Sequence, residues 1–143
     1  MTAKEYLSQA YRLNERINAH VRELDELRKL STSIQAVNFE LHVDGTKDPD
    51  PPYVKLIHKI ADMQEEINQE IDTLVDFKHE VRTAILQVHG EDERLLLRYR
   101  YLENMEWDDI ASCLNVTTRT AHRIHSSALQ KFTVPNEEWR LLP

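Results

Sequence analysis

The chain has 143 residues, a formal net charge of −7 and a composition that suits a long helical element joined to a small globular one. It contains only two glycines, which excludes a glycine-rich phosphate-binding loop, and a single cysteine, which excludes an intramolecular disulfide. The start of the sequence lacks the apolar segment of a signal peptide, and no apolar run is long enough to span a bilayer. We therefore expect a soluble, cytoplasmic protein.

Two long amphipathic patterns occupy the first part of the chain. In residues 3–34 apolar side chains recur at helical spacing, several of them seven residues apart as in a coiled coil. Residues 37–52 interrupt this pattern with Gly45 and three prolines and are expected to form a loop. A second helical pattern covers residues 53–88. Two patterns of similar length joined by one loop predict a long, coiled-coil-like antiparallel helical hairpin over residues 1–89.

Two helices alone cannot bury all of these apolar positions. Either a second copy of the chain or the C-terminal domain should cover the rest. We expect the hairpin to oligomerise, most simply as a homodimer in which part of the apolar surface is buried within each chain. The alternative is a coiled coil formed purely between chains. The residues assigned to the oligomerisation seam are Leu13, Ile17, Leu24, Leu27, Ile60, Ile67, Leu74 and Val81.

The second part of the chain is predicted to be a separate domain. Gly90 is expected to end the preceding helix, and the acidic residues that follow it suit the first turn of the next helix. We place the domain boundary there, so that residues 90–133 form a three-helix helix-turn-helix domain and residues 134–143 form a tail. The fold class expected for the whole chain is all-α.

Residues 106–132 have the spacing of a helix-turn-helix. Ala111 is small enough for two helices to cross closely. Asn115 occupies the turn position that requires a left-handed backbone, for which asparagine is the best choice after glycine. Thr117 can cap the second helix, residues 117–132, through its hydroxyl group.

The charge distribution favours DNA as the partner of this domain. Most of the excess acid lies before residue 93, whereas residues 116–132 contain Arg119, Arg123 and Lys131 and no carboxylate. This predicts that the helix 117–132 binds the major groove of double-stranded DNA. The residues assigned to base contacts are Thr118, Arg119 and Arg123, and those assigned to backbone contacts are Thr117, Thr120, His122, Ser126 and Lys131.

The segment LLLRYRYLENMEWDDIASCLNVTTRTAHRIHSSALQKF resembles region 4 of bacterial sigma-70 factors. The resemblance implies a promoter-binding helix-turn-helix whose base-reading positions fall on Thr118, Arg119 and Arg123, with His122 at a backbone-contacting position. Thr118 replaces an arginine common in the family, so the target sequence should differ from a housekeeping promoter element. The other sigma regions have no counterpart here. The layout of the whole chain is similar to small phage proteins grouped with late-gene transcription activators.

These observations lead us to expect a phage-encoded, sequence-specific transcription regulator associated with the bacterial nucleoid. Its expected partners are double-stranded DNA, a second copy of the chain and host RNA polymerase. One alternative is a DNA-recognition subunit of a phage packaging terminase, and another is an antagonist that mimics a sigma module and binds protein only. No catalytic residues, cofactor, small-molecule substrate or membrane contact are expected.

A metal site is not expected from the sequence either. His122 and His125 have no carboxylate or cysteine on their helix to complete a ligand shell. The acidic run of Glu65, Glu66, Glu70 and Asp72 lacks a nearby helical Glu-x-x-His motif and is predicted to be a solvated face.

Overall fold

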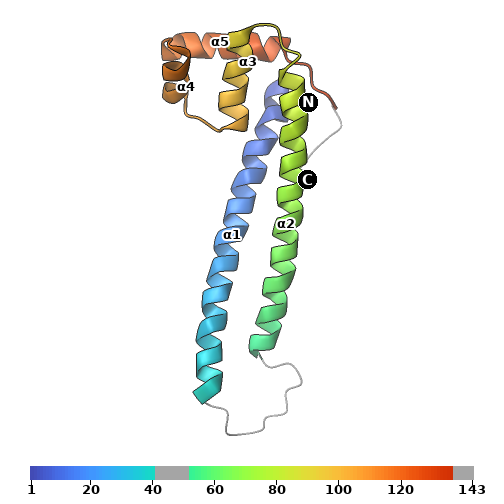
Figure 1. Ribbon diagram of the computed structural model, residues 1–143, viewed down its shortest axis with the longest axis vertical. Coiled ribbons are helices and arrows are strands. Elements are labelled where there is room, and N and C mark those ends of the chain that lie inside the picture. The colour runs from blue at the N-terminus through green and yellow to red at the C-terminus, as the bar shows by residue number, and fades with distance from the viewer. Residues whose placement is uncertain (41–51, 137–143) are drawn as a thin grey trace. The chain divides into compact units, whose positions relative to one another are not determined.

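The computed structural model describes residues 1–40 and 52–136, and the side chains of these residues except 35–40 (Figure 1). Every regular element within these ranges is a helix, which confirms the all-α prediction. No helix among the described residues is long and apolar enough to cross a membrane.

The residues form two compact units, which are described separately. The middle unit is Glu15–Asp72, and the end unit combines Met1–Asn14 with Thr73–Pro143. The predicted division at residue 90 stays a prediction. The grouping by contacts places both the beginning of the first helix and the end of the second helix with the C-terminal helices.

The first helix, α1 (Ala3–Glu40), begins with a capping box. The Thr2 backbone N–H donates to Glu5 Oε2 at 2.9 Å, and the Glu5 backbone N–H donates to Thr2 Oγ1 at 3.1 Å. The second helix, α2 (Pro52–Ile85), begins on proline, whose fixed φ suits the first helical position.

The loop predicted for residues 37–52 begins too early, because α1 extends further than expected. Helix α1 continues to Glu40 because residues 37–40 contain neither glycine nor proline to end it. The rest of the predicted loop, residues 41–51, lies outside the described residues.

In the middle unit α1 and α2 run antiparallel. Arg28 Nη2 donates to Gln64 Oε1 at 3.2 Å, and His20 Nδ1 donates to Glu70 Oε1 at 2.7 Å. The higher-numbered residue of α1 therefore contacts the lower-numbered residue of α2, as in an antiparallel pair. The apolar side chains buried here include Ile17, Leu24, Leu56 and Ile67. Their burial within one chain explains why these two helices pack as a pair.

The end unit joins the beginning of α1 and the end of α2 to the C-terminal helices. Tyr6 is fully buried, with its ring centroid 5.0 Å from that of Phe77 on α2 and 6.0 Å from that of Phe132 at the end of the last helix. These aromatic contacts place segments from both ends of the sequence in one apolar core.

Three further helices and a π-helical segment complete the end unit. They are α3 (Glu91–Leu97), the π-helix η1 (Arg98–Leu102), α4 (Trp107–Leu114) and α5 (Thr118–Lys131). Their shared core consists of Leu96, Ile110, Ala111 and Ala121, with Trp107, Leu114 and Ile124 among the side chains packed against it. Helix α3 ends where η1 begins, so the helix predicted to follow Gly90 is not continuous α-helix.

The prediction that Gly90 ends the second helix is wrong. Helix α2 ends at Ile85, and Gly90 is instead the residue before α3, with a φ of 110°. The chain turns between these two points, and Val88 is buried there while Leu86 and Gln87 are exposed. Burial of Val88 in a turn, rather than on a helical face, is a tertiary effect that the helical spacing did not reveal.

Candidate nucleic-acid interface

The turn between α4 and α5 has the predicted local structure. Asn115 has φ 56° and ψ 45°, which confirms the left-handed backbone expected at this position. Its N–H donates to the Ser112 carbonyl at 3.2 Å, and the Val116 N–H donates to the Ala111 carbonyl at 2.9 Å. These two bonds satisfy carbonyl groups at the end of α4 and allow the chain to reverse in three residues.

Thr117 caps α5, as predicted. Its Oγ1 accepts a hydrogen bond from the Thr120 backbone N–H at 3.2 Å, and its hydroxyl donates to Thr120 Oγ1 at 2.9 Å. The single hydroxyl proton of Thr117 is thus already used, whereas the hydroxyl proton of Thr120 is available to an acceptor. Of these two residues, Thr120 is the better donor to a phosphate group.

The two arginines assigned to base contacts lie on one exposed face of α5. Arg119 and Arg123 are four residues apart, and neither forms a hydrogen bond or an ion pair within the described part of the chain. His122 and Ser126 are also exposed on this helix, which contains no carboxylate, and the Ser126 hydroxyl already donates to the His122 carbonyl at 3.2 Å. This set, which we call the α5 face, offers cations and donors to a ligand without an internal anionic competitor.

Two other predicted contact residues are already bonded to acidic side chains. The Thr118 hydroxyl donates to Asp108 Oδ1 of α4 at 3.2 Å. Lys131 Nζ lies 3.0 Å from Glu93 Oε1 and also donates to the His89 carbonyl at 3.2 Å. Their DNA contacts stay predictions, and each would require the side chain to exchange or share its present partner.

A buried aromatic cluster that the sequence analysis missed supports the α5 face from behind. The Tyr101 hydroxyl and His125 Nε2 are joined by a hydrogen bond of 2.7 Å, and both residues are buried. Burial lowers the pKa of His125 to about 4, and electrostatic interactions with Lys4, His122 and Arg100 act in the same direction. His125 is therefore neutral at neutral pH.

Trp107 connects this cluster to the exposed surface. Its ring centroid lies 4.1 Å from that of His122 and 4.8 Å from that of His125, and the Arg100 guanidinium lies 4.8 Å from the Trp107 centroid. These contacts restrain α4 against α5 and hold the His122 ring in place. The sequence shows these aromatic residues but not their pairing, because Trp107 and the two histidines belong to different helices.

The start of α4 differs in charge from the α5 face. Asp108 and Asp109 lie in its first turn and are exposed. Carboxylates stabilise a helix N-terminus, but they repel phosphate groups. A DNA backbone would therefore be accommodated along α5 more readily than at the beginning of α4.

The residues assigned to the oligomerisation seam are mostly covered by their own chain. Leu27 and Ile60 are half-buried, and the others, Leu13, Ile17, Leu24, Ile67, Leu74 and Val81, are buried. The larger apolar side chains that remain exposed in the described residues include Val21, Leu30, Ile57 and Ile71 in the middle unit. A contact between copies stays a prediction, and these exposed side chains are better placed for it than the buried ones.

Comparison with known proteins links most of the chain to one family. A family model described as protein of unknown function (DUF1492) matches residues 31–133. This range includes α2 and all of the C-terminal helices. No curated protein and no solved structure matches the chain.

Proposed function

The chain belongs to the DUF1492 family of proteins of unknown function, and we propose that it is a sequence-specific DNA-binding transcription regulator. In this proposal α4, the turn and α5 act as a sigma-70 region 4-like helix-turn-helix, and α5 enters the major groove. The protein would be phage-encoded, act as a homodimer on nucleoid DNA and work by binding rather than catalysis.

The observation that carries the proposal is the α5 face itself. Arg119 and Arg123 project from one side of a helix that follows the tight turn at Asn115. No described residue neutralises their charges. A guanidinium group can donate two parallel hydrogen bonds to O6 and N7 of guanine. Two such groups, spaced by about 6 Å along α5, can reach two different base pairs.

The other residues of α5 have supporting roles in this proposal. Thr118 assists base recognition, and the backbone phosphates are contacted by Thr117, Thr120, His122, Ser126 and Lys131. Thr120 and the Trp107-stacked His122 are the donors that need the least rearrangement. Host RNA polymerase is a further proposed partner.

The direct test is DNA binding by wild type and by arginine variants. A target would first be selected from fragmented phage and host DNA, and affinity then measured by fluorescence anisotropy. Arg119→Ala and Arg123→Ala should each weaken binding by about 1 to 3 kcal/mol and relax the preference at one base pair. Arg22→Ala, which removes the same charge from an exposed position of α1, is the control and should bind as wild type does.

The same preparation separates the proposal from its two alternatives. Affinity for DNA should fall steeply with salt, because each neutralised phosphate releases counterions. Protein binding without any DNA shift would favour the sigma-mimicking antagonist. Light scattering should give a dimer, whereas a ring of eight or more subunits would favour the packaging subunit. Unchanged DNA affinity in both arginine variants would refute the assignment of the α5 face.

A further inference from the structure

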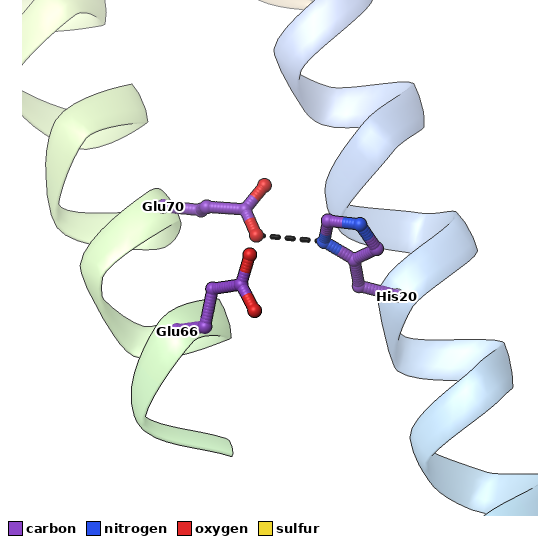
Figure 2. Close-up of side chains that lie close together, drawn as sticks. All are labelled: His20, Glu66 and Glu70. Atoms are coloured by element: carbon purple, nitrogen blue, oxygen red, sulfur yellow. Dashed lines mark hydrogen bonds and ion pairs between the residues drawn. The ribbon is translucent and has the colours of Figure 1, made fainter. Parts of the chain in front are cut away.

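We propose that His20, Glu66 and Glu70 form a binding site for a divalent transition-metal ion of the zinc class in the middle unit (Figure 2). One ligand atom from each side chain, a ring nitrogen and two carboxylate oxygens, lies within 4.8 Å of the other two. Figure 2 shows both carboxylates reaching from α2 towards the His20 ring on α1. This site is separate from the α5 face.

The two helices bring these groups together in a simple way. Glu66 and Glu70 are four residues apart on α2, so they share one face, and His20 approaches from the antiparallel α1. Two carboxylates at this spacing repel each other, and both His20 and Arg16 engage Glu70 rather than Glu66. A dication between the three groups would remove that repulsion and bond to Glu66 as well.

Glu70 supplies a second, independent observation. Its side chain is 14% exposed, and its Oε2 atom is fully buried and accepts no hydrogen bond. Arg16 Nε lies 3.6 Å from Oε2, which is too long for a hydrogen bond, and the Arg16 side chain is 45% exposed. Oε2 therefore has an ion pair with a half-exposed arginine but no hydrogen bond, which is costly for a buried carboxylate oxygen, and a metal coordinated by both Glu70 oxygens would satisfy it. The prediction that Glu70 belongs to a solvated face is therefore wrong.

The donor set selects the class of metal. One imidazole and two carboxylates, with water in the remaining position, are ligands that zinc accepts at about 2.0 to 2.2 Å. Ions such as Mg²⁺ prefer oxygen ligands alone. At zinc distances neighbouring donor atoms lie about 3.3 to 3.6 Å apart. The 2.7 Å contact between His20 and Glu70 must lengthen by less than about 1 Å, and the wider separations, of up to 4.8 Å, must shorten to this range, which side-chain rotation can provide.

The metal replaces the proton at His20 Nδ1, and the ring binds as a neutral imidazole that keeps one proton on Nε2; a net proton is released to solvent only if the ring was doubly protonated beforehand. The metal would then link α1 to α2 through three side chains. Because an unfolded chain does not hold these groups together, metal binding would stabilise the paired helices and fix their register.

The test is zinc binding by the full chain, measured by isothermal titration calorimetry and by thermal unfolding with and without ZnCl₂. Wild type should bind one zinc ion per chain, and its unfolding temperature should rise. Glu66→Gln and His20→Gln should each weaken zinc binding by about tenfold or more. Replacing a residue that only hydrogen-bonds to a metal ligand already has an effect of that size. Glu66 is exposed, so its replacement by glutamine leaves the core intact.

Two matched controls make the result specific to this site. Glu65→Gln removes the neighbouring exposed carboxylate, and His58→Gln removes an exposed histidine of the same helix. Both should bind zinc as wild type does, and MgCl₂ should not compete. The proposal is overturned if wild type does not bind zinc, if Glu66→Gln and His20→Gln bind it unchanged, or if the control variants lose it equally.

Discussion

His125 is a buried side chain whose protonation should control stability below neutral pH. It is 8% exposed, and its pKa is lowered to about 4, first by burial. In the unfolded chain histidine titrates near its ordinary value of about 6.5. Between these values the unfolded state binds more protons than the folded state. The contribution of neutral His125 to the free energy of unfolding is therefore fully present above pH about 6.5. It is lost as the pH falls towards 4, by up to about 3 kcal/mol.

His125→Gln tests this expectation, because glutamine can bond to the Tyr101 hydroxyl but does not titrate. Urea unfolding at about pH 7.5 and about pH 5 should show a loss of about 2 kcal/mol in wild type that is absent in the variant. The pKa of Glu93 is lowered mainly by its hydrogen bond with Lys131. Its contribution to stability is therefore lost only when the pH falls below the ordinary carboxyl pKa of 4.5. Equal losses in wild type and variant would show that His125 is not responsible.

At the scale of secondary structure, the start of α3 depends on Gly90. Its φ of 110° is rarely adopted by L-residues, and a Cβ atom there would meet Glu93 Oε2. Glu93 can move aside only by disturbing its contacts with Lys131 and Ser127. Gly90→Ala should therefore lower the free energy of unfolding by about 1 to 3 kcal/mol, measured by urea titration.

Two further variants separate the causes of that loss. Gln87→Ala, in the exposed turn before Gly90, should change stability by less than about 0.5 kcal/mol. In a Glu93→Ala background, Gly90→Ala should retain only the backbone penalty, so the two changes should not be additive. Strict additivity would mean that Glu93 does not oppose the new methyl group.

The elements differ in how far the sequence predicts them. The left-handed Asn115 and the Thr117 cap were predictable because both depend on residues within one turn of the chain. The end of α2 was not, because the helical spacing continues to Val88, which is buried in the turn that follows the helix. The sequence also did not reveal the partners of Thr118, Lys131 and His20, because each of them bonds to a residue of another helix.

For the whole molecule, the aromatic contacts of Tyr6 predict that a change in α1 will weaken the C-terminal helices. Tyr6→Ala would remove a fully buried ring from beside Phe77 and Phe132 and should lower stability by about 3 to 5 kcal/mol. Hydrogen exchange followed by mass spectrometry should show lower protection in α3 and α5.

Leu24→Ala is the matched control, because it creates a cavity in the middle unit instead. It should lower protection in residues 15–34 and 56–72 while leaving α5 protected to the same degree. Loss of protection in α5 in both variants would show that the two units unfold as one.

The discontinuous end unit also has a consequence for the order of folding. Tyr6 is synthesised early but meets Phe77 and Phe132 only after most of the chain has left the ribosome. The middle unit needs only Glu15–Asp72, so its contacts close a shorter stretch of chain. Its formation draws Met1–Asn14 towards the end of α2 and reduces the entropy lost when the last helix is added. We therefore expect pairing of the long helices to precede assembly of α3, α4 and α5.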